Sequence, residues 1–151
     1  MESFENKIAV VTGGGTGMGR ELVCQLIAAG AHVAMCDVSL ENMDETLRLA
    51  NAGEQRLTHH LCDVSEEAQM LAFRDEVMAQ HHTAHINLLF NNAGIGGGGS
   101  FVKGDRDEWE RTYAVCWDGV YCGCRALLDA IVASEEGHTV NTSSVNGFWA
   151  S

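Results

Sequence analysis

The segment that most constrains the fold is a short apolar run followed at once by a cluster of glycines. Residues 7–12 read Lys-Ile-Ala-Val-Val-Thr, which is typical of a buried parallel strand. Five glycines follow within residues 13–19, and residues 17–29 then carry apolar side chains at helical spacing up to Gly30. Such a turn lets the backbone approach a ligand, and the next helix points free N–H groups at it. The pattern predicts a turn that binds a pyrophosphate, with a simple flexible turn as the alternative.

The rest of the chain continues this alternation of short apolar runs and longer helical patterns. We expect four more strands, at residues 32–37, 56–64, 86–91 and 138–144. Helices are expected at residues 41–52, at 66–80 with Ser65 as the N-cap, and at 107–134. This order predicts a single α/β domain over residues 1–151, with a Rossmann-like, doubly wound parallel sheet of five strands and helices on both faces.

The charge and hydropathy of the chain argue against several classes of partner. The formal net charge is −12 and the isoelectric point is about 4.8, so the surface has the same sign as nucleic acid and anionic membranes. No apolar stretch approaches the roughly 18 residues that a membrane span needs. The N-terminus has no basic region followed by a long apolar run. We therefore expect a cytoplasmic protein with no nucleic-acid or membrane partner.

The cysteines and histidines give no pattern of a metal site. None of the six cysteines forms a Cys-x-x-Cys pair, and without a secretory signal we expect free thiols. His81 and His85 are four residues apart and could share a helix face, but no third ligand is evident. We therefore expect no metal.

The expected second strand ends in an acid, Asp37, which lies 24 residues after Gly13. In dinucleotide-binding sheets a carboxylate at this place accepts hydrogen bonds from the adenosine ribose hydroxyls, and it repels a 2′-phosphate. No Lys or Arg follows within residues 38–40, and none precedes Arg20 in the glycine turn. The sequence therefore favours NAD over NADP, although a solvated loop acid is the alternative for Asp37.

Four motifs occur in order along nearly the whole chain. They are Thr12-Gly13-x-x-x-Gly17-x-Gly19, then Asp63-Val64 after the third strand, Asn91-Asn92-Ala93-Gly94 after the fourth, and residues 140–147 with Ser144. Together they make the chain resemble the short-chain dehydrogenase/reductase family. The resemblance implies that Ser144 is the catalytic serine, which donates to a substrate carbonyl oxygen and stabilises its developing negative charge. It also implies a cofactor site made of Gly13, Gly15, Thr16, Gly17, Met18, Gly19, Asp37, Asp63, Val64, Asn92, Ala93, Gly94 and Thr142.

The chain departs from the family pattern in two places. The family's catalytic Asn lies seven residues after a Trp, and counting from Trp109 reaches Cys116. A thiol is a weaker donor and acceptor than an amide, so we expect proton return to be slower or rerouted. The family's Tyr-x-x-x-Lys lies a dozen or more residues past the serine, whereas seven residues follow Ser144 here. We expect the sequence to be part of a longer enzyme, with a genuinely short product as the alternative.

The resemblance implies an NAD-dependent oxidoreductase that transfers a hydride between the nicotinamide and a secondary alcohol or ketone. Phe148 and Trp149 suggest an apolar small-molecule substrate, or they simply pack against further chain. A non-catalytic NAD(H)-binding module is the alternative function, and NADP-dependent reduction is a third. In the family the long helix, here residues 107–134, pairs with its copy, so we expect a homo-oligomer, a dimer or tetramer. Trp117 and Tyr121 could serve that face or the core.

Overall fold

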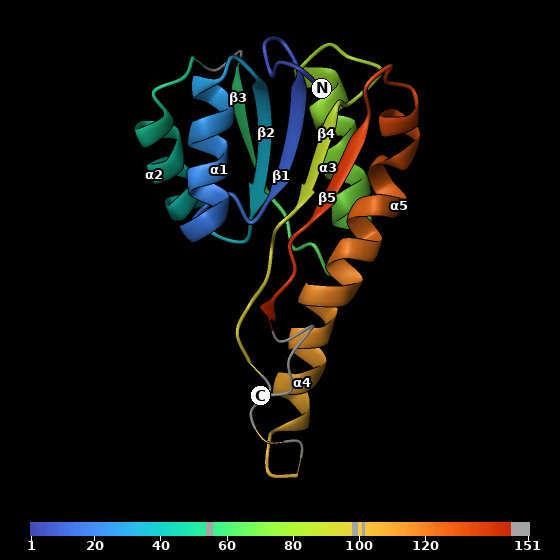
Figure 1. Cartoon of the computed structure of the whole chain (residues 1–151). Coiled ribbons are helices and arrows are strands. Elements are labelled where there is room, and N and C mark those ends of the chain that lie inside the picture. Colours follow the sequence, from blue (N-terminus) through green and yellow to red (C-terminus); the bar gives the residue numbers. More distant parts are fainter. Residues whose placement is uncertain (54–55, 98–99, 101, 146–151) are drawn as a thin grey trace.

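The computed structural model describes residues 1–53, 56–97, 100 and 102–145. Strands and helices alternate along it as β1 Ile8–Thr12, α1 Gly17–Ala28, β2 His32–Asp37, α2 Leu40–Ala50, β3 Leu57–Leu61, α3 Glu67–Gln80, β4 Leu88–Asn91, α4 Arg106–Tyr113, the π-helical turn η1 Ala114–Asp118, α5 Gly119–Val132 and β5 His138–Asn141. The strands form one parallel sheet in the order β3-β2-β1-β4-β5 (Figure 1). The predicted fold class is therefore confirmed.

The two faces of the sheet are both buried, because alternate side chains of the inner strands point to opposite sides. Val10 and Ala34 belong to one apolar cluster together with residues of α3 and α5, such as Phe73 and Leu127. Their strand neighbours belong to a second cluster with residues of α1 and α2. Figure 1 shows α1 and α2 on one side of the sheet and α3 and α5 on the other. The continuous apolar runs of the sequence thus correspond to strands covered on both faces.

The chain reverses its direction of winding at β1, which pairs with β2 on one side and with β4 on the other. Open parallel sheets bind ligands outside the carboxyl ends of the strands at such a switch point. The turns that leave β1, β2, β3 and β4 all emerge at this edge, and α4 extends beyond it (Figure 1).

Several predicted boundaries were wrong. The helix expected as one piece over residues 107–134 is divided by η1, where the backbone widens to π-helical hydrogen bonding. The third, fourth and fifth strands are shorter than expected, since β3 ends at Leu61, β4 begins at Leu88 and β5 ends at Asn141. Ser65 is not the N-cap: the N-cap position of α3 is taken by Glu66, which makes no side-chain cap, and the Ser65 hydroxyl donates to Asp63 Oδ1 at 2.6 Å. Within the described ranges, no helix has the length and apolar character to cross a membrane.

Candidate functional site

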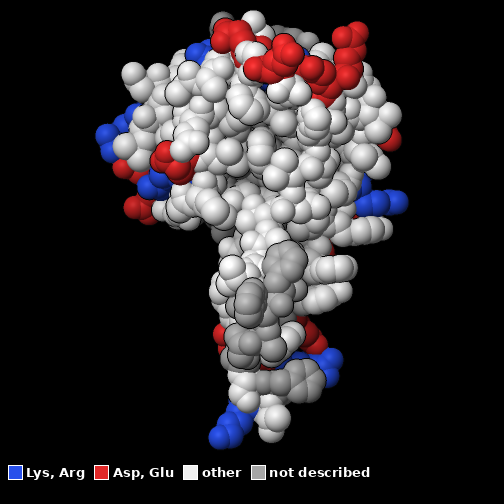
Figure 2. Space-filling view, in the orientation of Figure 1, with Lys and Arg blue, Asp and Glu red and all other residues white. Residues whose placement is uncertain are grey.

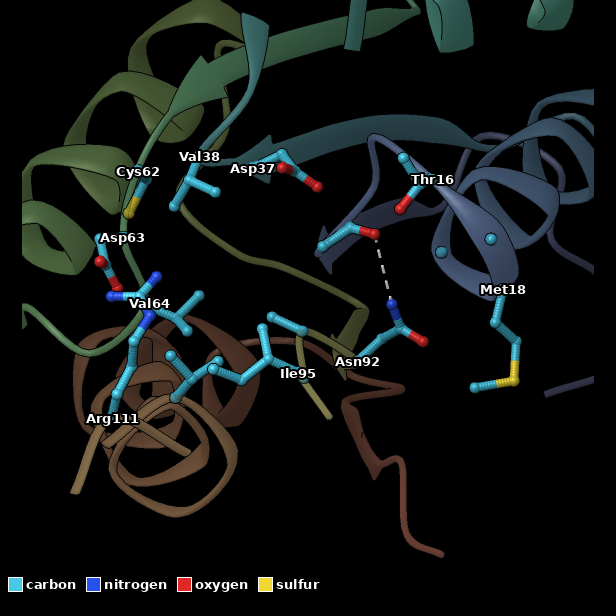
Figure 3. A pocket seen from close by; sticks show the side chains of 16 residues that line it. Thr16, Met18, Asp37, Val38, Cys62, Asp63, Val64, Asn92, Ile95 and Arg111 are labelled. Atoms are coloured by element: carbon cyan, nitrogen blue, oxygen red, sulfur yellow. Dashed lines mark hydrogen bonds between the residues drawn. The ribbon is translucent and has the colours of Figure 1, made fainter. Parts of the chain in front are cut away.

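An open cavity of about 390 Å³ lies at the carboxyl edge of the sheet (Figure 3). Its volume is within the range of small-molecule sites. It is lined by Gly13, Thr16, Gly17, Met18, Gly19, Asp37, Val38, Cys62, Asp63, Val64, Asn92, Ala93, Gly94, Ile95, Arg111 and Val115. The structure therefore brings together most of the expected cofactor residues. Gly15, Thr142 and Ser144 are expected site residues that do not line it.

The glycine turn has a shape that side chains would block. Gly13 has φ +68°, and a Cβ there would lie 2.8 Å from the Ala93 Cα. A Cβ at Gly19 would overlap the Gly13 carbonyl oxygen. Gly17, also at positive φ, faces open space, and Thr16 makes no side-chain cap to α1. Bare backbone and the uncapped amino end of a helix thus face the cavity, an arrangement that fits a dinucleotide pyrophosphate.

Asp37 is held by backbone amides on both of its oxygens. Its Oδ2 accepts from the Gly15 N–H at 2.9 Å and its Oδ1 from the Ser39 N–H at 3.1 Å. Gly15 therefore holds the Asp37 carboxylate in place through its backbone N–H, a role that the sequence pattern did not indicate. Arg20, the first basic residue after the turn, donates from Nε to the Gly15 carbonyl at 3.0 Å and to the Thr46 hydroxyl at 3.1 Å. Its guanidinium thus binds the glycine turn on the side that faces α2.

Asp63 is fixed in a similar way by Ser65, whose hydroxyl donates at 2.6 Å and whose backbone N–H donates at 3.0 Å to Oδ1. The hydroxyl hydrogen bond is the main cause of a lowered Asp63 pKa, and the positive charge of Arg111 adds to it. The next residue, Val64, is buried under the cavity and packs where Gly119 leaves room. The structure thus presents an ionised carboxylate beside an apolar wall.

The Asn92 side chain links the end of the fourth strand to the end of the first. Its Nδ2 donates to the Thr12 carbonyl at 3.0 Å and to the Gly13 carbonyl at 3.4 Å, and the second of these hydrogen bonds is the dashed line in Figure 3. The Thr12 hydroxyl in turn accepts the backbone N–H groups of Asn92 and Ala93, each at 3.0 Å. Thr12 is therefore a structural residue of the site that spacing alone identified only as the start of the motif.

Ser144 and Cys116, expected at catalytic positions, lie outside the cavity lining, and so does Thr142, which was expected in the cofactor site. Thr142 follows β5 and donates its N–H to the Asn91 carbonyl at 3.0 Å, and its hydroxyl is 3.5 Å from Asn92 Oδ1. Ser144 is exposed beyond the end of β5. Cys116 lies in η1, also exposed, and its thiol donates to the Ile95 carbonyl at 3.5 Å. Gly98, Gly99 and residues 146–151, including Phe148 and Trp149, lie outside the described residues.

The histidines do not form a metal centre, and no cluster of three ionisable metal ligands occurs in the described part of the chain. His81 instead lies 3.0 Å from the Thr58 hydroxyl through Nε2 and meets the His32 ring edge-on. Burial lowers the His81 pKa to about 4, helped by neighbouring histidines, so this ring is neutral at pH 7.

The fold, the glycine turn and the cavity define a nucleotide-binding domain of the Rossmann type. A family model described as short chain dehydrogenase matches residues 7–151. The chain belongs to this family. Oxidoreductase SadH of Mycobacterium tuberculosis is 39% identical over 150 residues, which cover 99% of this chain and 54% of that protein. Epidermal retinol dehydrogenase 2 of Mus musculus is 34% identical over 147 residues, covering 97% and 47%. The chain spans about half the length of these curated relatives.

Solved structures agree with the family and include complexes with both dinucleotides. A short chain dehydrogenase/reductase from Burkholderia phymatum in complex with NAD gives a TM-score of 0.92 at 31% identity, covering 100% of this chain and 53% of that one. A metagenomic short-chain oxidoreductase in complex with NADP gives 0.85 at 32%, covering 96% and 66%. The choice between NAD and NADP must therefore be argued from the residues of this chain.

Proposed function

We propose that this chain is the cofactor-binding half of an NAD-preferring oxidoreductase acting on a secondary alcohol or ketone. The observation that carries the proposal is the Asp37 carboxylate at the end of β2, lining the cavity and anchored by the Gly15 and Ser39 amides. A fixed negative charge at this place accepts from ribose hydroxyls and repels a 2′-phosphate. Arg20, the nearest basic residue of the turn, is occupied by the turn's own carbonyl.

Each wall of the cavity has a separate task in this proposal. The amides around Thr16, Gly17 and Met18 hold the pyrophosphate. The ionised Asp63 accepts from the adenine amino group. The segment from Asn92 to Gly94 leaves room for the second ribose. Bound there, NAD supplies the hydride acceptor, or NADH the donor.

The acidic side chains on the face shown in Figure 2 do not oppose the binding of a dinucleotide. Their largest group lies over the amino ends of the strands, away from the edge of the sheet where the cavity opens. On this face the acidic side chains of a chain with a formal net charge of −12 thus gather away from the cavity edge. The diphosphate therefore meets backbone amides at the glycine turn rather than this acidic group.

The chemical step needs groups beyond the cavity. Ser144 polarises the substrate oxygen, and the resemblance implies a Tyr beyond it that acts as the general acid/base, with a Lys that lowers the pKa of this Tyr and holds the nicotinamide ribose. Cys116 takes the place of the Asn, with its thiol on the Ile95 carbonyl. The substrate is an apolar small molecule, in keeping with a relative named as a retinol dehydrogenase. The location is cytoplasmic.

The outer side of η1 and α5 supports a homo-oligomer. Tyr113 and Trp117 stack with their ring centroids 6.2 Å apart, Arg125 lies over the Tyr121 ring, and Trp117 is 65% exposed. A row of exposed aromatic groups on one helix side is suited to a second copy of the chain.

The test is equilibrium titration of the protein with NADH and with NADPH, followed by NAD-coupled assays of the complete gene product on apolar secondary alcohols. Tighter binding of NADH together with turnover supports the proposal. Tighter NADPH binding would refute the cofactor preference. NADH binding without turnover by the complete product would favour the second candidate, a non-catalytic NAD(H)-binding module.

A further inference from the structure

Arg111 is a cavity residue to which neither the sequence motifs nor the proposed function gives a task. It lies in α4, and among the described residues that line the cavity it is the only Lys or Arg. Val115, one helical turn later, lines the cavity too. This side of α4 and η1 therefore forms a wall of the cavity that faces the strand ends.

The Arg111 side chain lies beside the Asp63 carboxylate, and Figure 3 shows both at the same end of the cavity, away from Thr16 and Met18 of the glycine turn. Ser65 directs both of its hydrogen bonds to one carboxylate oxygen, Oδ1. Arg111 comes from α4, a different element, and its positive charge lies close enough to lower the pKa of the Asp63 carboxyl.

The residues around this pair suit a flat base. Val38, Cys62, Val64 and Val115 line the same cavity and offer apolar surface. A guanidinium is planar, always charged and able to stack on a ring. The end of the cavity thus combines apolar walls, a fixed hydrogen-bond acceptor and a planar cation, which together can recognise a base that carries an amino group.

We infer that Arg111 is a specificity-determining residue for the adenine base, closing this end of the cavity and keeping the Asp63 carboxylate aimed at the adenine amino group. The inference rests on the proposed function, because it takes the dinucleotide as the ligand. It goes further in assigning base recognition to α4 as well as to the strand ends.

The experiment compares NADH with reduced nicotinamide hypoxanthine dinucleotide, in which a carbonyl oxygen replaces the adenine amino group. Both are titrated into the complete protein by nicotinamide fluorescence. An ionised Asp63 attracts an amino group and repels a carbonyl oxygen, so we expect the wild type to prefer NADH by about tenfold or more. Arg111→Met should lose most of this preference, and Arg111→Lys, which keeps the charge, should retain part of it.

The matched control is Arg106→Met, on the same helix, whose side chain is 87% exposed and paired with Glu110. It should leave the preference unchanged. Failure of the wild type to bind NADH would overturn the proposed function itself. NADH binding with no preference for the amino group, or an Arg111→Met protein that keeps the full preference, would overturn the inference alone. Equal weakening of both ligands in Arg111→Met would overturn the assignment of base specificity, because Arg111 would then contribute to binding without distinguishing the amino group from the carbonyl.

Discussion

The Oδ2 atom of Asp37 accepts the backbone N–H of Gly15 at 2.9 Å, so the acid at the end of β2 and the glycine turn after β1 form one unit. A side chain at Gly15 would collide with this carboxylate, since a Cβ there would lie 2.8 Å from Oδ2. The group that would select the cofactor also holds the turn that would bind its diphosphate. A substitution of Asp37 must therefore be designed to separate charge from shape.

Asp37→Asn separates them, because the amide oxygen can still accept from Gly15 while the negative charge is lost. We expect NADH to bind more weakly and NADPH more tightly, changing the ratio of the two dissociation constants by about tenfold or more. Titration with both dinucleotides measures it. Asp44→Asn, at an acid of α2 whose side chain is 68% exposed, is the control and should leave the ratio as it was. An unchanged ratio in Asp37→Asn would show that the charge does not select the cofactor.

Gly19→Ala tests the close packing of the turn. The added methyl group would overlap the Gly13 carbonyl oxygen and also approach Asn92. We expect the free energy of unfolding to fall by about 2 kcal/mol, with loss of NADH binding, because overpacked backbone must shift. Gly53→Ala is the matched control, since its Cβ would have no neighbour within 4 Å. Urea denaturation and NADH titration check both effects, and a Gly19→Ala protein as stable as Gly53→Ala would contradict this packing.

The sequence was sufficient for the features that depend on local patterns. The alternation of strands and helices, the glycine turn and the position of Asp37 all follow from periodicity and residue type. The structure places the glycine turn and Asp37 together at one edge of the sheet. Three features could not be read in this way. Gly15 looked like a ligand residue, but it supports Asp37, which only the three-dimensional neighbourhood shows. The π-helical turn η1 is only five residues long, so it hardly changes the spacing of apolar side chains along the helices on either side. The spacing therefore predicted one continuous helix. Arg111 reaches the cavity from an element some 50 residues away from Asp63, a contact with no signature in spacing.

The depressed His81 pKa predicts a loss of stability in mild acid. In the unfolded chain this ring has the ordinary histidine pKa of about 6.5, whereas in the fold its pKa is about 4, with burial as the main cause. Above pH 6.5 both states are neutral and the ring has no effect on the pH dependence. As the pH falls from 6.5 to 4 the unfolded state binds the proton first, so stability decreases. We expect a loss of about 2 kcal/mol over this window after allowing for solvent screening of a partly exposed ring.

The measurement for this ring is chemical denaturation of the wild type and His81→Gln between pH 7 and pH 4. Gln can still reach the Thr58 hydroxyl but does not titrate, so the variant should lose less stability across the range. His85→Gln, at an exposed histidine, should follow the wild type. Parallel curves for His81→Gln and the wild type would show that another group causes the acid sensitivity.

Cys116 should react with thiol reagents before the other cysteines. All six cysteines belong to the described part of the chain. Cys116 is exposed in η1, whereas Cys24 and Cys124 are half-buried and the remaining three, Cys36, Cys62 and Cys122, are buried. Burial also raises the pKa of the Cys122 and Cys24 thiols, which leaves less of each in the reactive thiolate form. We expect iodoacetamide to label Cys116 at least about tenfold faster than any other cysteine in the native protein, as measured by peptide mass mapping.

NADH should slow this labelling, because Gly94, Ile95 and Val115, which adjoin the Cys116 thiol or backbone, line the proposed cofactor cavity. Cys116→Ser should abolish the fast phase, and a fast phase that persists in it would assign the reactive thiol elsewhere.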